Sequence, residues 1–246
     1  MQKQKTKRNR VSESGNVLFL ILIAVALFAA LSYAVTQSTR TGGGSGDNET
    51  ALISSAQLTQ YPATIRTSVV RMIISGADIT SLEFNAPDQF SNLLSNAVGV
   101  FHPSGGGATY SQSPGDMMAT GNPGTWVFNA ENEILYLGTT NEAALGTPLD
   151  TTVDVIAFLP GITQTLCSRI NDELGIAGIP VETGIDVVEN LDNSDGTLSG
   201  RTDFCEGGCG ATIGQDVPAL DAQPFGCFEL TASSGNYVYY HVLVER

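Results

Sequence analysis

The chain begins with a polar, basic segment that runs into a long apolar one. Residues 1–16 carry five basic side chains, and residues 17–35 (VLFLILIAVALFAALSYAV) have only Ser32 and Tyr33 as polar breaks. At about 1.5 Å per residue, this apolar run would rise roughly 28 Å as a helix, close to the thickness of a bilayer's hydrocarbon core. The pattern predicts a transmembrane helix over residues 16–40, including its polar exit.

A glycine-rich stretch and a second helical pattern follow. Residues 41–47 (TGGGSGD) predict a flexible linker, since glycine loses the most conformational freedom on ordering. Apolar residues then recur at helical spacing, which predicts an amphipathic helix over 48–75, kinked near Pro62 and stopped by Gly76. The apolar positions of this helix are Leu58, Ile65, Val69, Met72 and Ile73.

The remainder reads as short elements separated by turn signals. We expect helices over 86–97 and 163–174, an exposed glycine-rich loop over 99–124, and strands over 125–129, 134–138 and 152–158. At the end of the chain, strands over 225–231 and 237–245 flank a turn at 233–236, and side chains alternate along the last strand, which predicts a hairpin. A helix followed by mostly antiparallel strands indicates an α+β domain over residues 48–246, with the amphipathic helix packed on the sheet.

Charge is distributed unevenly along the chain. From Thr41 onward there are 24 acidic residues and five arginines, whereas all lysines lie in the first ten residues. Because short basic flanks stay in the cytoplasm, residues 1–15 are expected inside and the acidic domain outside. This acidic domain is not expected to bind nucleic acid.

The cysteine pattern agrees with export. An even number of cysteines in a translocated domain indicates two disulfides first, and three connectivities are open. A zinc site is the alternative, because the spacing of Cys205 and Cys209 suits metal ligands, but no histidine lies near that pair. The four cysteines are Cys167, Cys205, Cys209 and Cys227.

The junction between the basic and apolar segments distinguishes three kinds of signal. A cleaved secretory signal has a shorter apolar core followed by small residues, and a plain signal anchor fits the hydropathy. A basic leader, then Gly15, then an apolar helix that begins at Asn16 resembles the class III signal of type IV pilins and pseudopilins. This resemblance covers the N-terminal layout and the helix-then-sheet order behind it.

The resemblance implies a processing step and a role for the apolar helix. In that family, a prepilin peptidase cleaves after the glycine, the new first residue is methylated, and the helix becomes the filament core. Here the cleavage would fall between Gly15 and Asn16. Asn16 replaces the family's usual Phe or Met, and Leu20 replaces the glutamate at the fifth mature position. These departures favour a minor pilin or pseudopilin over a major one.

The function that the resemblance implies is a structural subunit of a type IV pilus or type II secretion-like filament. Its partners would be other pilin-like subunits, the prepilin peptidase and an inner-membrane assembly platform. It would reside in a bacterial inner membrane, with the outer domain in the periplasm or on a cell-surface filament. A C-terminal region tied by disulfides is also implied, with Cys167 joined to Cys205 or Cys209 and Cys227 to the other. The alternative is a single-pass envelope protein whose acidic domain binds a ligand or surface.

No arrangement of residues in the sequence indicates catalysis, so we expect no enzyme and no cofactor. The two histidines, His102 and His241, have no nucleophile motif near them in sequence. An acidic run at 189–196 (ENLDNSDG) is a weak calcium candidate, through Asp192, Asn193 and Asp195. An EF-hand register fails there, because Leu191 would occupy the first ligand position. The alternative is a solvated turn rich in Asp and Asn.

Overall fold

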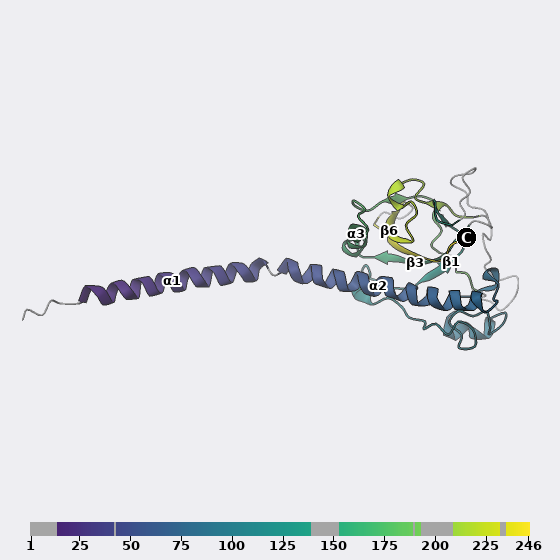
Figure 1. Ribbon diagram of the computed structural model, residues 1–246, viewed down its shortest axis with the longest axis horizontal. Helices are drawn as coiled ribbons and strands as arrows, with labels where there is room; N and C mark the ends of the chain where they lie inside the picture. Colours follow the sequence, from purple (N-terminus) through teal and green to yellow (C-terminus); the bar gives the residue numbers. More distant parts are fainter. Residues whose placement is uncertain (1–13, 42, 139–152, 189, 193–208, 232–234) are drawn as a thin grey trace, which may run out of the picture. The chain divides into compact units, whose positions relative to one another are not determined.

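The computed structural model describes residues 14–41, 43–138, 153–188, 190–192, 209–231 and 235–246 (Figure 1). By its internal contacts the chain divides into two compact units, Met1–Thr50 and Ala51–Arg246. Two long helices, α1 (Ser14–Thr41) and α2 (Gly43–Ile74), come before the first strand in the sequence. A shorter helix, α3 (Gln164–Glu173), lies between strands of the sheet domain in the sequence. The described residues also form four short 3-10 helices: η1 (Ile79–Ser81), η2 (Pro87–Asn92), η3 (Gly115–Met117) and η6 (Pro218–Leu220).

Helix α1 contains the apolar segment that we predicted to be a transmembrane helix. Leucine and alanine, which favour helix, make up much of this segment. Among the residues that the structure describes, no helix is long and apolar enough to cross a membrane. The prediction of a transmembrane helix over 16–40 is therefore wrong.

Residues 43–47 are helical, where we predicted a flexible linker over 41–47, and Gly42 lies outside the described residues. Helix α1 extends to Thr41 and α2 begins at Gly43, so its first turns include Gly44 and Gly46. Glycine in a helix interior costs only about 1 kcal/mol relative to alanine. A helix that is anchored further along its length can tolerate that cost.

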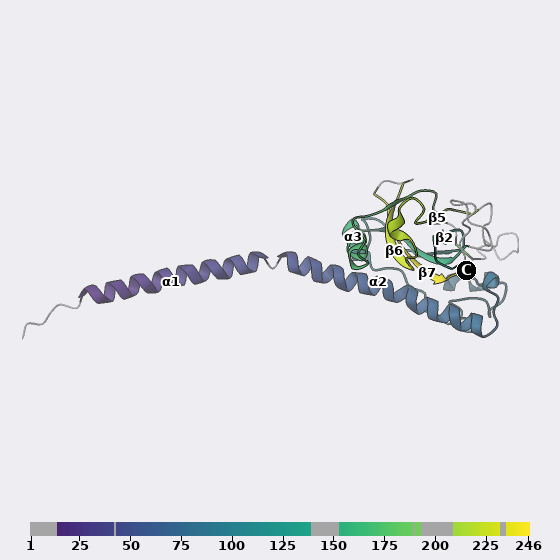
Figure 2. The same ribbon diagram turned by 45° about the horizontal axis from the view of Figure 1, so that its top comes forward.

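The domain that follows α1 is built on a mainly antiparallel sheet, as predicted, and this sheet has five strands. Strands β1, β3, β7 and β6 are antiparallel neighbours in that order, and β4 joins β6 in parallel. A separate parallel pair, β2 and β5, lies beside this sheet (Figure 2). The antiparallel pairing of β6 and β7 confirms the predicted C-terminal hairpin. The strand bounds are Val127–Asn129 (β1), Glu133–Ile134 (β2), Val155–Ile162 (β3), Val181–Glu182 (β4), Thr212–Ile213 (β5), Phe225–Leu230 (β6) and Tyr237–Val244 (β7).

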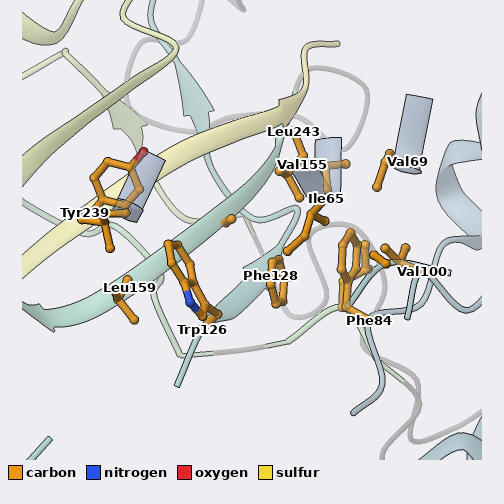
Figure 3. Close-up of a cluster of buried hydrophobic side chains, with 14 of the residues drawn as sticks. Ile65, Val69, Phe84, Val100, Trp126, Phe128, Val155, Leu159, Tyr239 and Leu243 are labelled. Atoms are coloured by element: carbon orange, nitrogen blue, oxygen red, sulfur yellow. The ribbon is translucent and has the colours of Figure 1, made fainter. Parts of the chain in front are cut away.

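Both faces of the sheet are buried, because alternate residues of β3 and β7 enter two separate apolar clusters. On one face, Val155, Leu159 and Leu243 share a cluster with the buried stripe of α2 (Figure 3). This confirms the predicted amphipathic helix, whose core positions are Leu58, Ile65, Val69 and Met72. On the other face, Phe158 and Tyr240 pack with the residues of β2 and β5.

Helix α3 is attached to β6 by a disulfide and by a side-chain amide. It was predicted over 163–174 and begins one residue later, after Thr163, whose hydroxyl accepts a hydrogen bond from the Leu166 backbone N–H. Gly175 follows it at φ +75°. Cys167 is bonded to Cys227, with 5.4 Å between the two Cα atoms. Asn171 Nδ2 donates to the Cys227 carbonyl at 2.9 Å, and its Oδ1 accepts from the Cys227 N–H at 3.1 Å.

The Cys167–Cys227 bond corrects the pairing implied by the pilin resemblance. That resemblance joined Cys167 to Cys205 or Cys209, whereas α3 packs directly against β6 and so faces Cys227. Cys209 also lies in a disulfide. Cys205 lies outside the described residues.

The segment predicted as an exposed loop over 99–124 is exposed over about half of its residues, but it also contributes buried residues to the core. Val100 and Phe101 are buried, and the Ala108 N–H donates to the Val100 carbonyl. The backbone approaches itself so closely at Gly106 that an added Cβ would lie 2.3 Å from the Val100 oxygen. The absence of a side chain at Gly106 therefore permits close packing of the backbone. The helix predicted over 86–97 is also wrong, since only the 3-10 turn η2 forms there.

Replacing Gly106 should destabilise the fold, because the new methyl group has no space. We expect Gly106→Ala to lower the free energy of unfolding by about 1–3 kcal/mol. Gly115→Ala is the matched control, because no heavy atom lies within 4 Å of a Cβ built there, and its effect should stay within about 0.5 kcal/mol. Urea unfolding followed by circular dichroism measures both. Equal stabilities of the two variants would contradict the packing described here.

Candidate functional site

The most extensive exposed apolar surface in the described part of the chain is helix α1. Every described side chain from Leu18 to Tyr33 is exposed, and this run of more than four turns presents apolar groups in all directions. No charged residue occurs between Asn16 and Arg40. Eleven large apolar side chains of this run are between 40 % and 73 % exposed: Leu18, Phe19, Leu20, Ile21, Leu22, Ile23, Val25, Leu27, Phe28, Leu31 and Tyr33.

Such a surface is unfavourable in water unless something covers it. Burying one large apolar side chain stabilises by about 1.5–3 kcal/mol, and exposed apolar patches of this kind mark interaction sites. Ala26, Ala30 and Ala34 follow one another at four-residue spacing, so they lie along one line of the helix. Small residues in such a line let a second helix approach closely. The surface therefore suits apolar helices as partners.

The predicted processing junction lies in the first turn of this helix. Gly15 and Asn16 follow Ser14, where α1 begins. Cleavage between them would leave residues 16–41 as a continuous helix. Leu20, which occupies the position of the family's glutamate, is 60 % exposed. The residue at this position is thus available to a partner, but it offers an apolar contact and no charge.

The calcium candidates lie only partly within the described residues. Asp192 is half-buried in a turn in which its N–H donates to the Asn190 carbonyl, and burial raises the pKa of its carboxyl. Asn193 and Asp195 lie outside the described residues. Within the described ranges, no group of three or more acidic, histidine or cysteine side chains could hold a metal ion. Calcium binding at this turn stays a prediction.

Each of the two histidines has a hydrogen-bond partner and packs against an aromatic ring. His241 Nδ1 lies 2.9 Å from the Tyr239 hydroxyl, and the His241 ring stacks on Phe225. Burial, with a smaller contribution from Arg66, lowers the pKa of His241 to about 4. His102 accepts a hydrogen bond from the Ser104 N–H through Nδ1 and packs edge-on against Phe90.

Sequence reasoning missed two buried carboxyl groups that hold backbone segments of the sheet domain together. Asp154 accepts hydrogen bonds from the Ile134 and Arg246 N–H groups, and Glu182 Oε1 accepts from the Gly214 N–H. The second oxygen of Glu182 is buried with no hydrogen-bond partner among the described residues. Burial raises the pKa of each carboxyl to about 7. Each of these acidic residues lies in a short apolar segment of the sequence, and no sequence motif there indicates a buried carboxyl group.

The raised pKa of Glu182 predicts that stability falls as the pH rises. The carboxyl of Glu182 loses its proton near pH 4.5 in the unfolded chain and near pH 7 in the folded chain. Its contribution to the free energy of unfolding is therefore complete below pH 4.5 and is lost as the pH rises from 4.5 to 7. We expect Glu182→Gln to weaken this decline, because the amide oxygen still accepts from Gly214 and no charge is buried. Thermal unfolding midpoints between pH 4 and 8 measure the effect.

Two features of this experiment separate Glu182 from other acids. Asp172→Asn, at an exposed position of α3, should leave the pH profile unchanged. Asp154 titrates in the same range, so part of the decline should persist in Glu182→Gln. A profile of Glu182→Gln that equals that of the original chain would contradict this assignment.

Together, the fold and this surface define a class: a disulfide-braced α+β domain preceded by an exposed apolar helix. Comparison with known protein families, with curated proteins and with solved structures found no match to this chain.

Proposed function

We propose that this chain is a structural subunit, of the minor pilin or pseudopilin kind, of a type IV pilus or type II secretion-like filament. Copies or related subunits would associate by packing their α1 helices side by side. The observation that carries this proposal is the exposure of apolar side chains on every side of α1, with no charge from residue 17 to residue 39.

The outer domain supports this role through its construction. A buried disulfide between Cys167 and Cys227 suits an oxidising compartment outside the cytoplasm. A long helix that packs its apolar stripe under a mainly antiparallel sheet has the order of elements that the pilin resemblance implies. The acidic composition keeps the domain's own surface in water while α1 carries the association.

The N-terminal junction supports processing by a prepilin peptidase. Removal of residues 1–15 would take away all five leader cations and free Asn16 as the first residue. With Leu20 in place of a glutamate, no carboxylate is present to pair with a neighbour's terminal amine. Assembly would then rest on apolar packing, which fits a subunit present in few copies.

The proposal is tested by the assembly state of the purified chain. We expect sedimentation velocity and electron microscopy to show large assemblies, and Leu22→Asp to abolish them, because it places a charge in the apolar contact. The matched control is Ile74→Asp, which introduces the same carboxylate at an isolated apolar position of α2 that is 81 % exposed. A monomeric original chain, or unchanged assembly of Leu22→Asp, would overturn the proposal and favour an acidic binding domain that does not polymerise.

Processing is tested separately by the mass of the mature chain. Co-expression with a prepilin peptidase should yield a chain that begins at Asn16, and Gly15→Leu should retain the leader. A mature chain that still begins at Met1, or one cut near Val35, would contradict this step.

A further inference from the structure

A cavity of about 470 Å³ lies at the C-terminal end of α2, where the helix meets the segment 97–105. Its volume falls within the range of cavities that bind small molecules, roughly 300–1,000 Å³. Among the described residues that line it, Arg71 is the one charged residue, and no acidic side chain is present. Met72 and Val98 belong to the apolar part of its wall, and Ser104 adds a hydroxyl group.

Arg71 differs from two other arginines of the same domain in having no acidic partner. Arg66 and Arg169 each form an ion pair with a glutamate at 3.0 Å. Arg71 forms no ion pair within the described part of the chain, although 24 acidic residues and only five arginines follow Thr41. The positive charge at the cavity is therefore available to a ligand.

The guanidinium of Arg71 is held by a tightly packed backbone segment. It donates a hydrogen bond to the Gly106 carbonyl. Gly106 packs so closely that an added Cβ would lie 2.8 Å from the sulfur atom of Met72. A guanidinium has several N–H donors, so one carbonyl leaves most of them for another acceptor. The hydroxyl of Ser104 forms no hydrogen bond within the described residues and offers a further donor.

The end of α2 does not cancel this positive charge. The last carbonyls of a helix carry partial negative charge and disfavour anions when they are left open. Here the Gly76 N–H donates to the Ile73 carbonyl, and the Ala77 N–H donates to the Met72 carbonyl. Gly76, at φ +98°, makes this glycine cap possible. Since these carbonyls already accept hydrogen bonds, Arg71 dominates the charge at the cavity.

We propose that this cavity binds a small organic carboxylate with a short aliphatic chain. The carboxylate would accept hydrogen bonds from the guanidinium of Arg71 and the hydroxyl of Ser104, and the aliphatic chain would lie against Met72 and Val98. Hydrogen bonds between two charged groups are stronger than neutral ones, and a planar guanidinium matches the geometry of a carboxylate. This site is independent of α1 and of assembly.

Two other ligand classes fit the wall less well. A cation would meet the charge of Arg71 with no carboxylate to offset the repulsion. A phosphate ion would pair with Arg71 but has no apolar part to cover Met72 and Val98. An aliphatic carboxylate uses both halves of the wall.

The test is isothermal titration calorimetry of the full chain with butanoate, at constant ionic strength. We expect saturable binding that Arg71→Gln weakens by about tenfold or more in Kd. Arg169→Gln removes the same charge from an arginine of α3 and should leave Kd unchanged. Butylammonium and inorganic phosphate should each bind at least about tenfold more weakly than butanoate.

A second variant separates ligand binding from folding, because Arg71 also holds the Gly106 carbonyl. Ser104→Ala leaves that hydrogen bond intact and should weaken butanoate binding by about threefold or more. Ser91→Ala, at an exposed position outside the cavity, should not change it. An unchanged Kd in both Arg71→Gln and Ser104→Ala would overturn the proposal. Binding that does not saturate, or phosphate binding as tight as that of butanoate, would also overturn it.

Discussion

Removing the disulfide between Cys167 and Cys227 should lower the free energy of unfolding by about 4 kcal/mol. The bond closes a segment with a sequence separation of 60 residues, and a crosslink of that span removes much of the unfolded chain's freedom. Both cysteines are completely buried, so the loss is not offset by new solvation in the folded state. For a domain with ordinary stability, this is a large part of the total.

The measurement is guanidinium unfolding of Cys167→Ala/Cys227→Ala beside the original chain. The double variant avoids a free thiol that could exchange with the bond at Cys209. We also expect a steeper dependence on denaturant, because the uncrosslinked chain exposes more surface when it unfolds. A loss below about 1 kcal/mol would show that the crosslink adds little to the fold.

Truncating Phe128 should have an effect of similar size. Phe128 is 1 % exposed, stacks on Phe84 and meets the edge of Phe101, so alanine would leave a cavity where three rings join. We expect Phe128→Ala to lower the free energy of unfolding by about 3–5 kcal/mol. Urea or guanidinium unfolding measures it.

Two comparison variants sharpen this prediction. Phe128→Leu keeps most of the buried volume and should cost clearly less than alanine. Leu94→Ala removes a side chain that is 51 % exposed and should change stability by no more than about 0.5 kcal/mol. If Phe128→Ala lowered the free energy of unfolding by no more than Leu94→Ala, the cluster of rings would contribute little to the stability of the core.

The elements that the sequence predicted well are those with a strong period or a clear cap. The α2 stripe recurs at helical spacing and the last strand alternates, so both were found. Thr163 and Gly175 bracket α3 with a side-chain cap and a positive φ, so its bounds were predicted within a residue. Long-range packing decided the rest. Gly106 looked like a loop residue because only the fold shows that Val100 passes beside it.

The candidate sites follow the same division. Hydropathy identified the helix α1, but its assignment as a membrane-spanning helix was wrong. The pairing of Cys167 depends on which strand lies under α3, and no local pattern contains that information.

The amide of Asn171 has a consequence for the reduced protein. It forms hydrogen bonds with both the N–H and the carbonyl of Cys227 and also donates to the Gly178 carbonyl. None of these hydrogen bonds involves sulfur. Reduction would therefore cost global stability while α3 stays docked on β6. Before oxidation, the reduced chain would thus already have α3 in its final position on β6. The sulfur atoms of Cys167 and Cys227 would then lie close enough to form the disulfide.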